Sequence, residues 1–119
     1  MQLPGEYATP RGRLLLAFTD TLIAGSVALR DLDNGVCEVR RLFVRPQARG
    51  LGLGRALMTT VMAEARIAGY PAIRLETLET MCEAQALYRS LGFVEIAPYR
   101  PPTSEHDRTV SMELTLSHP

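Results

Sequence analysis

The sequence predicts an α/β fold in which a mixed, mostly antiparallel sheet carries helices on its faces. Two observations lead to this prediction. In the first third of the chain, short apolar runs alternate with turn signals, a pattern typical of strands joined by hairpins. After Pro46 the apolar residues recur at helical spacing, and a short apolar run separates this helix from a second one. An antiparallel meander that leads into a strand–helix–strand crossover forms a mixed sheet.

Apolar runs, turn residues and helix stops place the elements in order. The expected elements are strands at 13–19, 22–30 and 36–44, a helix at 52–68, a strand at 72–75, a helix at 81–91, and strands at 93–96 and 108–116. Asn34 and Gly35 form the strongest short hairpin signal, and Gly69 and Gly92 are natural helix stops. Residues 1–12, which are rich in proline and glycine, are expected to form an irregular lead-in.

Composition narrows the class of protein. With 119 residues the chain is expected to form a single domain, 1–119. Its 13 basic and 13 acidic residues cancel, so neither a nucleic-acid nor a membrane partner is expected. No apolar run approaches the ~20 residues of a membrane span, and we expect a cytoplasmic protein. Cys37 and Cys82 are expected to be buried free thiols. His106 and His118 show no metal-ligand spacing, so no metal is expected.

The most informative stretch joins the third expected strand to the first expected helix. Gly50, Gly52 and Gly54 stand at alternate positions, which keeps side chains away and lets successive backbone N–H groups face one concavity. The helix N-terminus adds unpaired amides and a partial positive charge. With Arg49 and Arg55 on either side, these groups form an anion site suited to the pyrophosphate of a cofactor.

The same turn has three other interpretations. The glycines could serve only the tight packing of a strand against a helix. A Walker A loop is excluded, because it needs Lys followed by Ser or Thr where Arg55 and Ala56 stand. A dinucleotide-binding fold stays open: Arg55 replaces its third glycine, although Glu76, at the end of the next strand, resembles its ribose-binding acid.

Two motifs, in this order, resemble those of the GCN5-related N-acetyltransferases, the GNAT family. They are Arg49-x-x-Gly52-x-Gly54 after a strand, and Ala84-x-x-Leu87-Tyr88-x-x-x-Gly92-Phe93. The stretch 38–46 also looks like the fourth strand of that family, and the matching segments together cover residues 36–94. The resemblance implies a GNAT-like acyl-CoA N-acyltransferase fold.

The resemblance also implies where acetyl-CoA would bind. It would lie in a V-shaped opening between the third strand and the next, parallel one. Backbone groups of Leu42 and Val44 would pair with the pantetheine arm and thioester, and the amides from Gly50 to Arg55 would hold the pyrophosphate. The implied cofactor-binding residues are Leu42, Phe43, Val44, Arg49, Gly50, Leu51, Gly52, Leu53, Gly54 and Arg55.

Acetyl transfer to an amine asks for two proton handlers. By resemblance Tyr88 is the acid, and an unperturbed tyrosine, with a pKa of roughly 10, is protonated at neutral pH; the alternative is an aromatic that only packs in the core. Glu38 is the candidate base, and strict alternation would place it on the same face as Leu42 and Val44. The alternative for Glu38 is a salt bridge to an arginine such as Arg40 or Arg74.

The sequence departs from the family pattern at two places. Members usually carry one strand and two helices before the first hairpin, and here only twelve residues precede it, so we expect an N-terminally shortened relative. Apolar surface left bare by the missing helices would favour a homodimer. Met81 stands where many members place an asparagine that bonds the pantetheine, and Met cannot donate that bond.

Several further polar residues are candidates for the acceptor side. Glu76, Glu79 and Glu83 could attract a cationic amine, although acids in a first helical turn also complement the helix dipole. Tyr99 and Arg100 could line an acceptor pocket. The acceptor itself is not identified by the sequence.

The sequence therefore favours an acetyl-CoA dependent N-acetyltransferase. Such an enzyme would move the acetyl group to a primary amine on a small molecule or peptide by direct attack in a ternary complex. The alternatives are an acyl-CoA-binding module without turnover and a nicotinamide dinucleotide-binding domain.

Overall fold

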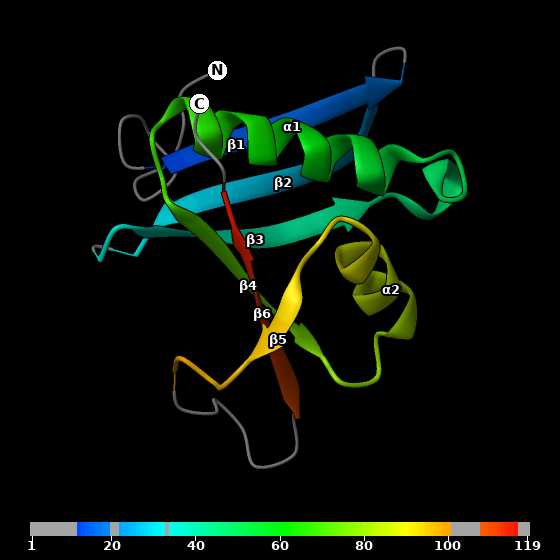
Figure 1. Cartoon of the computed structure of the whole chain (residues 1–119). Coiled ribbons are helices and arrows are strands. Elements are labelled where there is room, and N and C mark those ends of the chain that lie inside the picture. Colours follow the sequence, from blue (N-terminus) through cyan, green and yellow to red (C-terminus); the bar gives the residue numbers. More distant parts are fainter. Residues whose placement is uncertain (1–11, 20–21, 33, 101–107, 117–119) are drawn as a thin grey trace.

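The computed structural model describes residues 12–19, 22–32, 34–100 and 108–116. Within these residues a six-stranded sheet combines with two α-helices (Figure 1). The elements are β1 (Gly12–Thr19), β2 (Leu22–Asp31), β3 (Val36–Val44), the short 3-10 helix η2 (Pro46–Ala48), α1 (Leu53–Ile67), β4 (Ala72–Leu78), α2 (Cys82–Ser90), β5 (Val94–Ile96) and β6 (Thr109–Thr115). The order of elements expected from the sequence is confirmed.

The strands follow the order β1-β2-β3-β4-β6-β5. Only the pairing of β3 with β4 is parallel among the described strands, and the other neighbours are antiparallel. The mixed, mostly antiparallel sheet is therefore confirmed. Figure 1 shows α1 lying along β1, β2 and β3, and α2 beside the ends of β3 and β4.

The end of β4 differs most from the expected boundaries, and the other ends that differ do so by one residue. β4 continues to Leu78, three residues beyond the expected end, because it pairs with β6 as far as Leu78 opposite Thr109. Gly12 belongs to β1, so the expected lead-in is one residue too long; its residues 1–11 lie outside the described part of the chain.

β3 and β4 pair over a short distance and then separate. Their register holds at three positions, Val36 opposite Ala72, Cys37 opposite Ile73, and Glu38 opposite Arg74. Beyond Glu38 no further pair joins the two strands in the described structure. The sheet therefore opens into a V between the C-terminal halves of β3 and β4, and the loop from β3 to α1 lies at its mouth (Figure 1).

A β-bulge in β3 changes which face its side chains occupy. Val39 lies opposite Leu29 of β2, and Val44 lies opposite Gly25. Leu29 and Gly25 share a face, since four residues of regular strand separate them. A Cβ on Gly25 would lie 3.1 Å from a Leu57 side-chain atom, so this face is the one that α1 covers. Val39 and Val44 therefore both face α1 although five residues separate them, which requires one extra residue in β3.

The bulge overturns one expectation about Glu38. Leu42 and Val44 pack against the core under α1, as does Val39. Glu38, the neighbour of Val39, lies on the opposite face of the sheet. Strict alternation, which placed Glu38 with Leu42 and Val44, is wrong here. Glu38 is nevertheless only 2% exposed, so something other than α1 must cover it.

The core lies between α1 and the sheet. The buried residues of α1 recur at helical spacing, as its apolar face requires; they are Leu57, Met58, Val61, Met62 and Ala65. The expectation for the two cysteines is half right. Cys37 is buried in this core, where burial raises its pKa to about 12, whereas Cys82 is exposed at the beginning of α2. Among the described residues, no helix is long and apolar enough to cross a membrane.

Candidate functional site

Two clefts meet at the opening between β3 and β4. The larger, of about 820 Å³, lies between the end of β3, the beginning of α1 and the beginning of α2. The smaller, of about 370 Å³, lies between the two separating strands on the Glu38 side. Leu42, Met81 and Tyr88 line both clefts. A group bound at these three residues would therefore be reachable from either cleft.

The glycine-rich turn forms one wall of the larger cleft. Gly50 and Gly52 adopt φ values of 82° and 78°, which favour glycine. Gly52 caps the N-terminus of α1 without any side-chain cap, and no acidic residue stands in the first turn. The amides and the partial positive charge of this helix end therefore remain unneutralised by the helix itself.

The space at this turn fits a bound anion. A Cβ placed on Gly50 or Gly52 would have no atom of the described chain within 4 Å, so neither glycine is required by packing against the protein. The interpretation that the glycines serve only tight packing is thus weakened at these two positions. A concave, open backbone at a helix N-terminus is the arrangement that holds phosphates.

Nine of the ten expected cofactor-binding residues line the larger cleft. They are Leu42, Phe43, Val44, Arg49, Gly50, Gly52, Leu53, Gly54 and Arg55. Leu51 does not line it, and its side chain is 79% exposed. The sequence could not separate Leu51 from its neighbours, since only the direction of its side chain distinguishes it.

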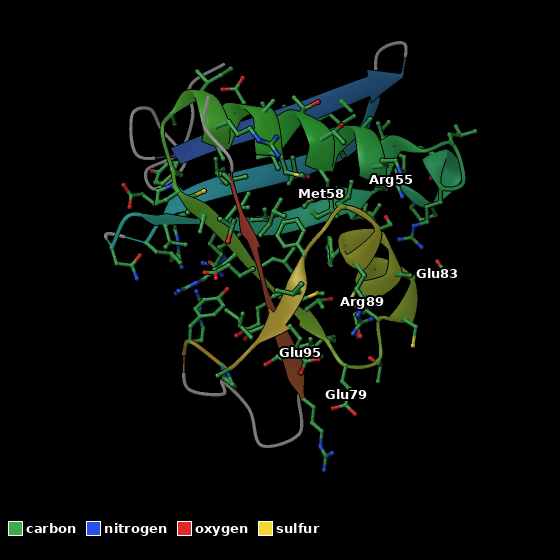
Figure 2. The ribbon with its side chains drawn as sticks, viewed as in Figure 1. Arg55, Met58, Glu79, Glu83, Arg89 and Glu95 are labelled. Atoms are coloured by element: carbon green, nitrogen blue, oxygen red, sulfur yellow. The ribbon has the colours of Figure 1, made fainter. Side chains whose placement is uncertain are left out.

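The two arginines beside the turn are each held by one hydrogen bond. Arg49 Nε donates to the Val44 carbonyl at 3.1 Å, and Arg55 Nη2 donates to Ser90 Oγ at 2.6 Å. The second bond links the beginning of α1 to the end of α2, and Figure 2 shows Arg55 at the end of α1 nearest to α2. A guanidinium has five N–H donors, so both side chains keep donors for an anion.

Tyr88 lies where the two clefts meet. It projects from α2, is 6% exposed, and its ring lies 6.0 Å from that of Phe93. Burial raises the pKa of its hydroxyl above the ordinary tyrosine value. Among the described residues, no group forms a hydrogen bond with this hydroxyl. The packing interpretation of Tyr88 is therefore confirmed by its ring, while its role as an acid stays a prediction.

Glu38 lies under a cluster of cationic side chains. Arg30 Nη2 lies 3.3 Å and Arg40 Nε 3.6 Å from its Oε1, while Arg100 and the Tyr99 hydroxyl both donate to Oε2. The salt bridge considered from the sequence is therefore present with Arg40. Arg74 does not take part, since it pairs with Glu113 at 2.8 Å.

Residues Tyr99 and Arg100 cover Glu38 from the chain segment after β5. Burial raises the pKa of Tyr99, and the bond to Glu38 and the charges of Glu38 and Glu76 raise it further. Arg100 lines the smaller cleft and Tyr99 does not. The sequence suggested an acceptor role for both, but gave no sign of their contact with Glu38, which lies 61 residues earlier than Tyr99.

The three acidic residues near α2 separate in the structure. Glu76 belongs to β4 and lines the smaller cleft. Glu83 lies in the first turn of α2 and lines the larger one. Glu79 is exposed in the turn between β4 and α2 and lines neither cleft (Figure 2). The helix-dipole interpretation therefore fits Glu83 and not Glu76.

Glu76 lines the smaller cleft from β4. Among the described residues no ion pair or hydrogen bond engages it. On β4 it stands two residues after Arg74, which lies opposite Glu38 in the strand register, so Glu76 shares the sheet face of Glu38. Sequence reasoning assigned it no catalytic part; its place on a strand face beside the V was the signal that could have identified it.

Metal ligands are not gathered in the described part of the chain. His106 and His118 lie outside it. Met81 lines both clefts and is half exposed, and its sulfur accepts a weak contact from Thr77 Oγ1 at 3.9 Å. The Met81 sulfur can offer a ligand only apolar contact. It cannot donate the hydrogen bond that the asparagine of many family members makes.

The fold and the two clefts define a class of protein. A sheet opened between two parallel strands, with a glycine-rich turn at the following helix, matches the acyl-CoA N-acyltransferases among solved structures. The Escherichia coli ribosomal-protein-S18-alanine N-acetyltransferase superposes with a TM-score of 0.80 at 25% identity, over 95% of this chain and 74% of that one. The yncA structure of Salmonella typhimurium, solved with its cofactor acetyl-CoA, shares the fold with a TM-score of 0.75 at 22% identity, over 88% and 65%.

The sequence comparison is more specific. The family model described as "Acetyltransferase (GNAT) family" matches residues 2–93, and the chain belongs to this family. An uncharacterized N-acetyltransferase of Schizosaccharomyces pombe is 38% identical over 96 residues. The match covers 79% of this chain and 59% of that relative, so the chain spans about three fifths of the relative's length.

Proposed function

We propose that this protein transfers the acetyl group of acetyl-CoA to a primary amine while both are bound. The observation that carries the proposal is that the cradle cleft and the smaller cleft meet at Tyr88, where a proton donor is available. Direct transfer needs the acyl group and the amine to meet without a covalent enzyme intermediate, and two adjoining clefts allow this. Family membership and the acetyl-CoA bound in the yncA structure support the choice of cofactor.

The cofactor would be held by groups of the larger cleft. Bound acetyl-CoA supplies an acetyl group activated as a thioester. The amides between Gly50 and Arg55 hold the pyrophosphate, and both flanking arginines add charge-assisted bonds. Beyond Glu38, the edge of β3 that faces β4 has no partner strand in the described structure, so its backbone groups are available to the pantetheine amides.

Tyr88 serves as the general acid in this proposal. Its raised pKa keeps the hydroxyl protonated at neutral pH, so it can give a proton to the departing sulfur. Its ring is fixed by the core, which holds the hydroxyl in place at the junction of the clefts. A donor held in this way needs no reorientation before the transfer.

Two carboxylates compete for the role of base. Glu38, the residue nominated by sequence, is 2% exposed, and three arginines and the Tyr99 hydroxyl already surround its two oxygens, which leaves an amine little room to reach it. Glu76 lines the same cleft, and none of the described residues donates a hydrogen bond to its carboxylate. We therefore assign proton removal from the amine to Glu76, directly or through water, and to Glu38 the positioning of Arg40, Arg100 and Tyr99.

The first test is a calorimetric titration of the protein with acetyl-CoA, with NADH as control. Acetyl-CoA should bind at micromolar concentrations and NADH should not. Binding of NADH alone would favour the dinucleotide-binding alternative and refute the proposal. Reversing the charge of Arg49 or Arg55 should weaken acetyl-CoA binding.

The second test addresses turnover. Tyr88→Phe should lower kcat about 100-fold or more, the usual contribution of a general acid, and leave the acetyl-CoA Kd unchanged. Tyr70→Phe removes a hydroxyl outside both clefts and should leave kcat unchanged. Acetyl-CoA binding without product for any amine would support the binding-module alternative.

A further inference from the structure

Arg40 and Glu76 face each other across the mouth of the V. The last pair on this side of the sheet is Glu38 opposite Arg74. Arg40 and Glu76 stand two residues further along β3 and β4, and therefore occupy the next positions on the same face. The bulge in β3 begins after Arg40 and does not change its face.

The opening keeps these two charges apart. In a continuous sheet, neighbouring strands lie about 4.8 Å apart and opposite charges at facing positions pair. Here no ion pair within 4 Å joins Arg40 and Glu76 in the described structure. Both residues line the smaller cleft. The Arg40 guanidinium and the Glu76 carboxylate thus belong to opposite walls of this cleft, and the cleft lies between them.

Arg40 also keeps its terminal donors. Its only contact with Glu38 among the described residues is made by Nε, at 3.6 Å, and its side chain is 32% exposed. The two terminal nitrogens of the guanidinium have no partner in the described part of the chain. Such a planar fork matches a carboxylate. Arg100, on the same cleft, adds a second positive charge on this side of Glu38.

We infer that the acceptor is a small zwitterionic amine that carries a carboxylate, such as a free amino acid. This inference rests on the proposed function and specifies its substrate. The carboxylate binds the Arg40 fork, and the ammonium lies toward Glu76, near Tyr88 and the junction with the cofactor cleft. A doubly charged phosphate fits less well, because Glu38 and Glu76 already place two carboxylates around the cleft. The volume of about 370 Å³ suits a small molecule.

The experiment compares acids with their amides. The protein is assayed with acetyl-CoA and each of the common free amino acids, and with the corresponding amino acid amides, and the acetylated product is measured by mass spectrometry. At least one acid should be used with a kcat/KM tenfold or more above that of its amide, since the amide lacks the charge that Arg40 binds.

Arg40→Gln tests the residue itself. It should raise the KM for the acid tenfold or more with kcat changed less than twofold, and leave the amide unaffected. Arg40→Lys should restore part of the difference by returning the charge without the fork. Arg66→Gln, in the last turn of α1 and outside both clefts, is the matched control and should change neither value. If Arg40 had only a structural role, Arg40→Gln would change the kinetic constants for acids and for amides equally.

Acetyl-CoA binding, measured in parallel, separates the two levels of the argument. Two results would overturn the inference while acetyl-CoA still binds: amides are acetylated as well as acids, or no amino acid is acetylated. The proposed function would then apply to amines of another class. If acetyl-CoA does not bind, the proposed function fails and the inference fails with it.

Discussion

Replacing Glu38 with glutamine should cost far more stability than a single ion pair near the surface. The substitution keeps the shape of the side chain and removes its charge. Glu38 is 2% exposed, while Arg30, Arg40 and Arg100 are 24%, 32% and 27% exposed. Removing one member of a buried ion pair costs about 3–5 kcal/mol. The arginines stay partly hydrated, so we expect the lower end, about 3 kcal/mol.

Urea denaturation followed by circular dichroism measures this loss. A domain of this size has a stability of roughly 6–18 kcal/mol, so Glu38→Gln should still fold. At an m value of about 1.5 kcal/mol per molar urea, the midpoint should fall by about 2 M with m unchanged.

Glu113→Gln is the matched control. Glu113 pairs with Arg74 at 2.8 Å, and both side chains are about a quarter exposed. A pair of this kind contributes about 0–1 kcal/mol. If Glu38→Gln costs no more than Glu113→Gln, Glu38 does not organise its surroundings, and its assignment as a positioning residue is wrong.

Three further predictions follow from the described geometry. Gly52→Ala should lower the free energy of unfolding by about 1 kcal/mol, because φ is 78° there, and should also weaken acetyl-CoA binding by filling the cradle; unchanged binding would place the pyrophosphate elsewhere. Iodoacetamide at pH 8 should alkylate exposed Cys82 and leave buried Cys37, whose pKa is about 12, unmodified until the protein unfolds, and CoA should protect Cys82, as peptide mass mapping can show. Tyr88 and Tyr99 have pKa values raised by burial, so the unfolded chain loses their protons first as pH rises. The unfolded chain also loses the Cys37 proton first, from about pH 8.5, so stability should begin to fall there and fall more steeply above about pH 10. Tyr99→Phe should reduce the steeper part, and an unchanged slope above about pH 10 in this variant would contradict the prediction.

Local patterns were sufficient to predict most of the elements. Periodicity, the Asn34-Gly35 turn and the glycine stops act over a few residues, and the sequence carries them directly. The end of β4 was missed because it depends on β6, a strand from a distant part of the chain. Pairing partners decide such boundaries, and they cannot be read from a single segment.

The two halves of the candidate site differ in the same way. The proposed cradle is contiguous from Arg49 to Arg55, so it could be proposed from the sequence alone. The smaller cleft is assembled from five separate segments of the chain. The bulge that turns Glu38 away from Val44 leaves no clear mark in the sequence, since an extra residue has no side-chain signature of its own. Arg100 reaches Glu38 only because the fold brings the segment after β5 across β3.

The short pairing of β3 with β4 has a mechanical consequence. In the described structure one half-sheet, β1-β2-β3, is joined to the other, β4-β6-β5, by three residue pairs. Core side chains that pack across both half-sheets join them as well. A ligand lodged in the V touches both halves and takes the place of the missing rungs. Its occupancy should therefore stiffen the molecule as a whole, adding RT ln(1 + [L]/Kd) to the free energy of unfolding. A bound ligand would therefore supply contacts between the two half-sheets where strand pairing is absent.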